Sequence, residues 1–127
     1  MPLPTDAQHL LDDWGRGNVL ARDCPSRPVL QHLTSRWGAL TMVVLATGTY
    51  RFGALRRQIA GISERMLAQT LQALEADGMV KRQAHDVVPP HVEYSLTPLG
   101  AEAATHVVAL AALIEGRLPL ILADRAT

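Results

Sequence analysis

The clearest pattern of apolar and polar positions lies in residues 61–82, GISERMLAQTLQALEADGMVKR. Three leucines at i, i+4 and i+7 predict the buried stripe of a helix: Leu67, Leu71 and Leu74. A guanidinium and two amides have the same spacing on another side: Arg65, Gln69 and Gln72. Ser63 is suited to cap the start of this helix, and Gly78 to end it in a left-handed conformation. The polar row then faces solvent, where it either aids solubility or binds hydrogen-bond acceptors in a groove.

Weaker apolar patterns predict three helices before this one. Residues 6–20 indicate a short helix and then a bend, because two glycines interrupt the apolar spacing. From Ser35 to Leu45 we expect a helix with this buried stripe: Trp37, Leu40 and Val44. The stretch from Phe52 to Ile59 predicts a compact helix whose inner side carries Leu55 and Ile59. A turn with a short extended piece, TGTYRF, precedes that compact helix, and the tight turn AGIS follows it.

Beyond Gly78 the apolar pattern changes from helical spacing to alternation. The segments MVKRQAHDVV and HVEYSLT predict two strands of a hairpin, separated by two prolines. Thr97 and Pro98 then start a long helix. One side of this helix is apolar: Leu99, Ala103, Val107, Leu110 and Ile114. Pro119 is expected to break or kink it and to leave a short terminal piece.

The order of these elements is typical of one fold. Helix, short strand, helix, turn, helix, hairpin and long helix make a mainly α chain with a small β-hairpin wing, which is a winged helix-turn-helix. In that fold the second helix of the motif enters the major groove of double-stranded DNA. The hairpin can lie along the backbone or the minor groove. The polar row on residues 61–82 is then placed to contact base edges.

Composition limits the class of protein. The chain has 127 residues, 48% apolar and 19% charged, which fits one globular domain. Its longest apolar run, VVALAALI, is far shorter than the ~20 residues that span a bilayer, so we expect no membrane partner. The N-terminus lacks the basic start of a secretory signal. A single cysteine excludes an intrachain disulfide framework, and a reducing cytoplasm is the simplest location.

Net charge argues mildly against a nucleic-acid partner, because phosphate contacts need cations. The formal charge of the whole chain is zero. Between Cys24 and Thr97, however, the charge is +3, and the two ends together carry −3. Lys81 is the single lysine, so the positive charge comes from arginine, which suits planar, bidentate recognition. Codon bias is the alternative explanation of the arginine excess.

The sequence gives no sign of catalysis, a cofactor or a metal site. Five histidines are scattered along the chain, and His85 and His91 stand on opposite arms of the predicted hairpin. They lack the close pairing of a zinc site. A P-loop, a nucleophile elbow and a GxGxxG motif are also absent from the sequence. We therefore expect neither an enzyme nor a bound metal or cofactor.

Four segments together resemble a known family. They are CP…VL at 24–30, RW…L at 36–40, YRFGALRRQIAGISERMLAQTLQALEADGMVKR at 50–82, and VPPHVEYSLTPLG at 88–100. In this order and spacing they resemble the HxlR family of bacterial, MarR-like winged-helix transcription regulators. The resemblance runs from about Cys24 to Leu113. It implies a cytoplasmic homodimer on a palindromic operator, with its recognition helix at 63–77 and its wing at 80–96.

The resemblance also implies a division of the chain. Residues 1–23 are an N-terminal extension and dimerisation helix, 24–97 the DNA-binding domain, and 98–127 a C-terminal dimerisation helix and tail. The chain departs from the family pattern where Thr34, Ser35 and Arg36 replace Gly-Gly-Lys, and where Leu113 replaces a tryptophan. These changes bear on the dimer surface and on one turn rather than on the DNA-binding motif.

Ten residues are candidates for DNA contact. Arg65, Gln69 and Gln72 are candidates for base edges, and Ser63 for a phosphate at the helix N-terminus. The candidate phosphate clamps before and on the first helix of the motif are Arg51, Arg56 and Arg57. Arg57 alternatively pairs with Glu64 or Glu75. In or near the wing the candidates are Lys81, Arg82 and His91.

Three questions stay open on sequence alone. Cys24 is either a sensor of oxidants or electrophiles, as in several relatives, or a small apolar residue in a helix-entry turn. The apolar C-terminal helix either buries a dimer seam or lines a pocket for a small-molecule effector. The whole protein is either a DNA-binding regulator, more a repressor than an activator, or a winged-helix protein–protein interaction module that has lost DNA binding.

Overall fold

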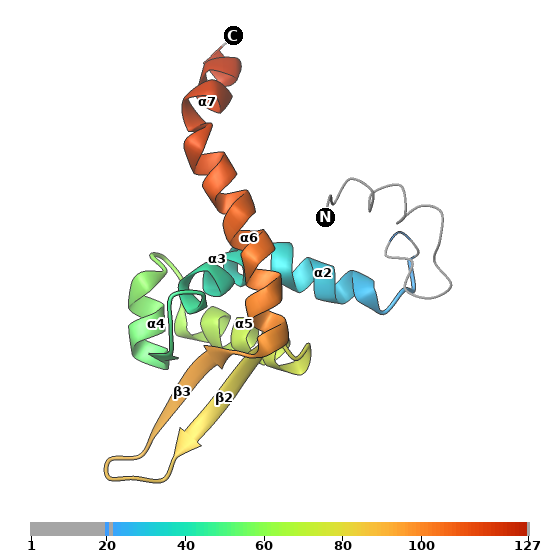
Figure 1. Cartoon of the computed structure of the whole chain (residues 1–127). Helices are drawn as coiled ribbons and strands as arrows, with labels where there is room; N and C mark the ends of the chain where they lie inside the picture. The colour runs from blue at the N-terminus through green and yellow to red at the C-terminus, as the bar shows by residue number, and fades with distance from the viewer. Residues whose placement is uncertain (1–19, 21, 127) are drawn as a thin grey trace.

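The structure, a computed structural model, describes residue 20 and residues 22–126. Within these residues nine elements follow one another: α2 Ser26–Thr34, α3 Arg36–Leu45, β1 Tyr50–Arg51, α4 Phe52–Gln58, α5 Glu64–Ala76, β2 Val80–His85, β3 His91–Leu96, α6 Pro98–Gly116 and α7 Leu118–Ala126. Figure 1 shows α3, α4 and α5 grouped as a body, from which the β2–β3 hairpin and the α6–α7 arm project in opposite directions. The mainly helical fold with a small wing is confirmed. The helix expected in residues 6–20 lies outside the described residues, apart from Leu20.

Helix α5 forms where its caps and stripe predict it. The Ser63 hydroxyl accepts a hydrogen bond from the Met66 amide at 3.0 Å, which satisfies one of the free amides of the first turn. Gly78 ends the helix with φ of 79°, a conformation that L side chains rarely adopt. The expected stripe is buried: Leu67, Leu71 and Leu74. The helix is therefore fixed in its rotation about its own axis.

The sheet has three antiparallel strands in the order β1-β3-β2. Strand β1 is the short extended piece expected in TGTYRF, and it places Arg51 opposite Glu93. Strands β2 and β3 pair along their whole length, from Val80 opposite Leu96 to His85 opposite His91. The wing is thus a regular hairpin whose last pair before the proline turn consists of two histidines.

The core lies where α3, α4, α5 and the start of α6 meet. Its members are buried apolar side chains: Met42, Leu45, Leu55, Ile59, Ile62, Leu67, Leu71, Leu74, Met79, Val80 and Ala104. Leu55 and Ile59 point inward as expected. The stripe expected in α3 is right only in part: Trp37 and Val44 are partly buried against the core, but Leu40 is 43% exposed, and the fully buried positions are Thr41 and Met42. Apolar residues surround most of α3, so their spacing does not single out the inner face.

Helix α6 is joined tightly to the body at its first turn. The Thr97 hydroxyl accepts from the Gly100 amide at 2.9 Å and donates to the Gly78 carbonyl at 2.6 Å. A Cβ placed on Gly100 would lie 1.9 Å from the Met79 carbonyl oxygen, so only glycine fits this crossing. The first half of α6 packs on the body, with Gly100 and Ala104 buried and Val107 partly buried, and its second half projects away from it. The helix ends at Gly116, before Pro119, and α7 follows as the expected terminal piece.

Helix α6 is also the most apolar long segment of the described chain. An 18-residue window within Pro98–Gly116 has a mean hydropathy of 1.3, and 11% of it is buried. By length and composition alone the helix is able to cross a bilayer, although the longest unbroken apolar run is short. A single helix of this kind is weak evidence for a membrane, because an exposed apolar helix also fits an interface between protein chains.

Candidate nucleic-acid interface

The polar face of α5 lies opposite its buried stripe. Successive residues of an α-helix are turned by about 100°, so Arg65, Gln69 and Gln72 share one side and the three leucines share the other. All three polar residues are exposed. Because the leucines are fixed in the core, the guanidinium and the two amides are held outward on a rigid element.

The N-terminus of α5 adds a fourth polar group to this surface. Ser63 is exposed, and its oxygen accepts from the Met66 amide. The hydroxyl hydrogen is not used by that bond and is free to donate to an anion. The positive end of the helix dipole lies at the same place. Ser63 is therefore both a structural cap and a chemically suitable phosphate contact.

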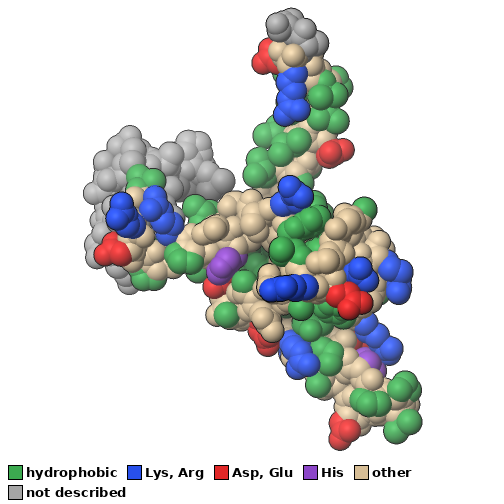
Figure 2. Space-filling model, turned by 180° about the vertical axis from the view of Figure 1, so that it is seen from behind, with side chains coloured by type: hydrophobic (Ala, Val, Ile, Leu, Met, Phe, Trp, Pro, Cys, Tyr) green, Lys and Arg blue, Asp and Glu red, His purple; other side chains and the backbone are tan. Residues whose placement is uncertain are grey.

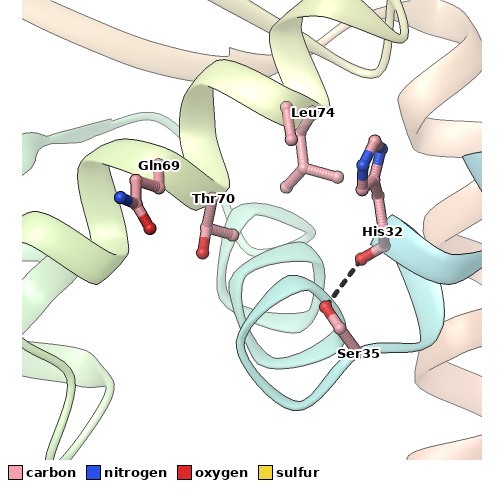
Figure 3. A pocket seen from close by; sticks show the side chains of 6 residues that line it. His32, Ser35, Gln69, Thr70 and Leu74 are labelled. Carbon is pink, nitrogen blue, oxygen red and sulfur yellow. Dashed lines mark hydrogen bonds between the residues drawn. The ribbon is translucent and has the colours of Figure 1, made fainter. Parts of the chain in front are cut away.

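A shallow hollow separates α5 from the end of α2 (Figure 3). Its volume is about 170 Å³, and the lining residues are His32, Ser35, Gln69, Thr70, Ala73 and Leu74. Figure 3 shows Gln69 and His32 on opposite sides of the hollow, with the Ser35 hydroxyl donating to the His32 carbonyl at 3.0 Å. The flank of the polar face next to Gln69 is thus concave rather than flat.

Sequence reasoning missed a hydrogen bond that joins α2 to the end of α5. His32 Nδ1 lies 2.6 Å from Asp77 Oδ2, and Asp77 is the C-cap residue of α5. The two residues are 45 positions apart, so neither periodicity nor a local motif signals their contact. The pair fixes the C-terminal end of α5 against the helix that follows Cys24.

The three arginines around α4 have different surroundings. Arg56 donates from Nε to the Ile62 carbonyl at 3.2 Å and lies 3.5 Å from Glu64 Oε1, so it braces the turn between α4 and α5. The structure therefore pairs Glu64 with Arg56, not with Arg57. Arg57 is exposed, and both arginines line an open hollow of about 320 Å³ beside that turn. Arg51 is exposed on β1, at the edge of the sheet.

The wing candidates are also unlike one another. Lys81 and Arg82 are exposed on β2, and adjacent strand residues point to opposite faces of the hairpin. His91 is half-buried; its Nε2 lies 3.8 Å from Glu93 Oε2, and its ring stacks on that of His85. Lys81 and Arg82 are thus open to a partner, whereas His91 is engaged within the wing.

Cys24 is buried immediately before α2. Its sulfur lies 2.8 Å from the Ser26 hydroxyl oxygen, and its carbonyl accepts from the Arg27 amide at 3.1 Å. The residue is held at the start of the helix that carries His32. Because the sulfur is buried, a reagent can reach it only after the residues that cover it move.

The apolar side of α6 packs on the core at Ala103 and Val107 and borders a groove farther along the helix. The groove has a volume of about 340 Å³ between α3 and α6 and is lined mainly by apolar side chains, among them Leu40, Val43, Leu110 and Ile114. Figure 2, seen from behind, shows that hydrophobic side chains continue along the projecting arm of α6 and α7. Several are exposed: Leu110, Leu113, Ile114, Leu118, Leu120 and Leu122.

Comparison with known proteins agrees with this geometry. A family model described as HxlR-like helix-turn-helix matches residues 32–120, which is most of the chain and includes α5 and the wing. The chain belongs to the HxlR-like helix-turn-helix family. The expected family and fold are therefore confirmed for this HxlR-like protein.

Relatives of this HxlR-like protein are named as regulators rather than enzymes. An uncharacterized HTH-type transcriptional regulator, YtfH of Escherichia coli (strain K12), is 62% identical over 109 residues, 86% of each chain. A solved structure of the transcriptional regulator ytfH from Salmonella typhimurium is 58% identical with a TM-score of 0.83, covering 88% of this chain and all of that one. The redox regulator HypR in its oxidised form is 35% identical with a TM-score of 0.67, covering 73% and 96%.

Proposed function

We propose that this HxlR-like protein is a cytoplasmic, sequence-specific DNA-binding regulator, more a repressor than an activator, which acts as a homodimer on a palindromic operator. The single observation that carries the proposal is the outward polar face of α5. A buried stripe fixes the helix, so Arg65, Gln69 and Gln72 form a rigid row of hydrogen-bonding groups. The family and the names of its relatives support the same function.

The chemistry of the row suits the major groove. An arginine there can donate two hydrogen bonds to guanine O6 and N7, and a glutamine can pair with adenine N6 and N7. Each good bidentate pair contributes about 1–3 kcal/mol of discrimination against a wrong base. Arg65 lies in the first turn of α5, the part of a recognition helix that contacts base edges most directly. Arg65 and Gln69 are therefore the principal readers, and Gln72 contributes less.

Contacts to phosphate position the helix without reading sequence. Ser63 offers a hydroxyl at the N-terminus of α5, and Arg51 and Arg57 are exposed beside the motif. Arg56 contributes less directly, because its guanidinium braces the turn before α5. In the wing Lys81 and Arg82 are the principal contacts, and His91 contributes less, because its ring is engaged with Glu93 and His85.

The α6–α7 arm supports the homodimer. Its exposed leucines and isoleucine make a long apolar surface that a single copy leaves in water. Burying such a surface against a second copy stabilises the assembly by about 25 cal/mol per Å² of apolar area. A two-fold dimer presents two recognition helices, and a palindromic operator matches that symmetry.

Selection of bound sequences from random double-stranded DNA, followed by fluorescence anisotropy, tests the proposal. We expect one palindromic sequence to be enriched, and we expect its affinity to fall with salt at a log–log slope near −0.9 per phosphate contact. Arg65→Ala should lower the affinity for this sequence by about 10-fold or more, since a bidentate contact is lost. Arg27→Ala, an equal change of charge at an exposed position on α2 outside the polar face of α5 and the α6–α7 arm, is the matched control and should bind like the wild type.

Two results would contradict the proposal at different levels. If no sequence were enriched, the protein would be a winged-helix module that binds another protein, which its zero net charge already suggests. If a sequence were enriched but Arg65→Ala bound it as tightly as Arg27→Ala, the assignment of the reading face would be wrong.

A further inference from the structure

Three potential metal ligands meet on one face of the wing. His85 and His91 are directly opposite each other in the last pair of the hairpin, and Glu93 is two residues from His91 on the same strand. His85 Nε2 lies 2.7 Å from Glu93 Oε1, and His91 Nε2 lies 3.8 Å from Glu93 Oε2. One ligand atom from each of the three residues lies within 4.8 Å of the others. The sequence placed the histidines on opposite arms; the register brings them together.

The two imidazole rings are also stacked on each other, in addition to their contacts with Glu93. The imidazoles stack with centroids 4.7 Å apart and an interplanar angle of 24°, and both direct Nε2 toward one carboxylate. The three side chains are 30%, 20% and 34% exposed for His85, His91 and Glu93, so they are partly withdrawn from water but still accessible to an ion. Two imidazole nitrogens and a carboxylate oxygen form a donor set that Zn²⁺ binds in proteins.

We propose that His85, His91 and Glu93 form a binding site for a divalent transition-metal cation of the zinc type. The cation takes Nε2 of each histidine and one oxygen of Glu93, and water completes the coordination. Each Nε2 binds as the neutral nitrogen, so its proton is released or moves to Nδ1. The carboxylate offsets part of the metal charge. The bound ion links β2 to β3 next to the proline turn of the wing.

The distances require only small side-chain movements. In a tetrahedral site with Zn–N and Zn–O bonds near 2.0–2.1 Å, ligand atoms stand about 3.3–3.4 Å apart. The present separations lie on both sides of that value, and rotation about side-chain bonds changes them without moving the strands. The neighbours of Glu93 in register on the same face are Gln83 and Arg51. Arg51 is the one cation of these two, and it stands opposite Glu93 on β1.

Titration of the tag-free protein with Co²⁺ and Zn²⁺, in the absence of DNA, tests the site. The wild type should bind one Co²⁺ per chain, seen as visible d–d absorption, and Zn²⁺ should displace it. We expect His85→Ala and Glu93→Gln to weaken binding by about 10-fold or more. His106→Ala removes an exposed histidine on α6 and should bind like the wild type. Cys24→Ser serves as the background, so that the thiol makes no contribution.

A second pair of measurements keeps the test decisive. Circular dichroism of each variant without metal shows whether the wing substitutions disturb folding, and His91→Gln replaces His85→Ala if that variant unfolds. The proposal fails if folded wing variants bind Co²⁺ as tightly as His106→Ala, or if the wild type binds none. Because no DNA is present, this outcome is independent of the proposed DNA-binding function.

Discussion

At the scale of single residues, two side chains of the candidate interface have two roles each. Ser63 caps α5 and retains a hydroxyl hydrogen for an anion, and Arg56 braces the turn before α5 with the charge that also attracts phosphate. Substitutions at these two positions therefore change stability and binding together. Arg65 is different, because its side chain is exposed on α5 and contributes little to the stability of the fold. This is why Arg65, not Ser63 or Arg56, is the residue on which the DNA-binding proposal is tested.

Cys24 gives a prediction at the same scale. Oxidation of its sulfur by diamide should lower the affinity for the selected DNA by about 10-fold, with recovery on reduction. The physical reason is that the sulfur is buried against Ser26, so a disulfide with a second chain requires the start of α2 to open. Helix α2 holds the end of α5 through His32 and Asp77, so the disturbance reaches the reading helix. The redox regulator HypR is a structural relative.

Anisotropy with and without diamide, for wild type and Cys24→Ser, measures this effect. The Cys24→Ser protein should bind equally well under both conditions, and a non-reducing gel should show a cross-linked dimer only for the wild type. An equal loss of binding in both proteins would exclude Cys24 as the sensor.

At the scale of elements, the junction of α5, the wing and α6 holds the fold in register. Met79 lies between α5 and β2, and its carbonyl accepts a hydrogen bond from the Thr97 amide at 3.1 Å. Gly100 packs directly on that carbonyl. One turn of α6 thus contacts both the end of α5 and the base of the wing. The junction has no space for a side chain at Gly100.

Gly100→Ala is expected to destabilise the protein by about 1–3 kcal/mol, because the added methyl group collides with backbone rather than with a flexible side chain. Urea unfolding followed by circular dichroism measures the change in the free energy of unfolding. Gly116→Ala, in the last turn of the same helix, is the matched control, since a Cβ there has open space. It should leave stability unchanged or raise it by up to about 1 kcal/mol. Equal effects of the two substitutions would show that the crossing is looser than the structure indicates.

The sequence predicts those parts of the fold that depend on neighbours along the chain. Helix α5 could be predicted from its caps and stripe, and the break before Pro119 from a single residue. The inner face of α3 could not, because most of that helix is apolar. The pairs His32–Asp77 and His85–His91 depend on tertiary packing and on hairpin register. The outward face of α5 was therefore predictable, whereas its brace and the candidate metal site were not.

At the scale of the whole molecule, apolar surface is distributed unevenly. The body buries its leucines around α5, but the α6–α7 arm exposes most of its own (Figure 2). Large contiguous apolar patches on soluble proteins usually mark sites of association. The groove between α3 and α6 adjoins this surface, so a second copy would cover both. Leu113 falls within the exposed part of the arm.

Leu113→Glu is expected to shift the protein from dimer to monomer, because it places a charge in the middle of the apolar arm. Sedimentation velocity over a range of concentrations measures the dissociation constant, which should rise by about 10-fold or more. Val88→Glu makes a similar change at the tip of the wing, where the side chain is 99% exposed, and should leave the association unaltered. A dimer of unchanged strength in Leu113→Glu would place the subunit interface elsewhere.

The Thr97 hydroxyl joins two parts of the molecule that the proposed dimer uses for separate tasks. It donates to the carbonyl of Gly78, just after α5, and accepts from the amide of Gly100, in the first turn of α6. In a dimer that associates through the α6–α7 arms, this side chain fixes the angle between each arm and its α5. The distance between the two copies of α5, which must be about 34–36 Å to enter adjacent major grooves on one side of DNA, then depends on that angle. The spacing between the two operator half-sites would therefore depend on Thr97 as well as on the residues that contact the bases.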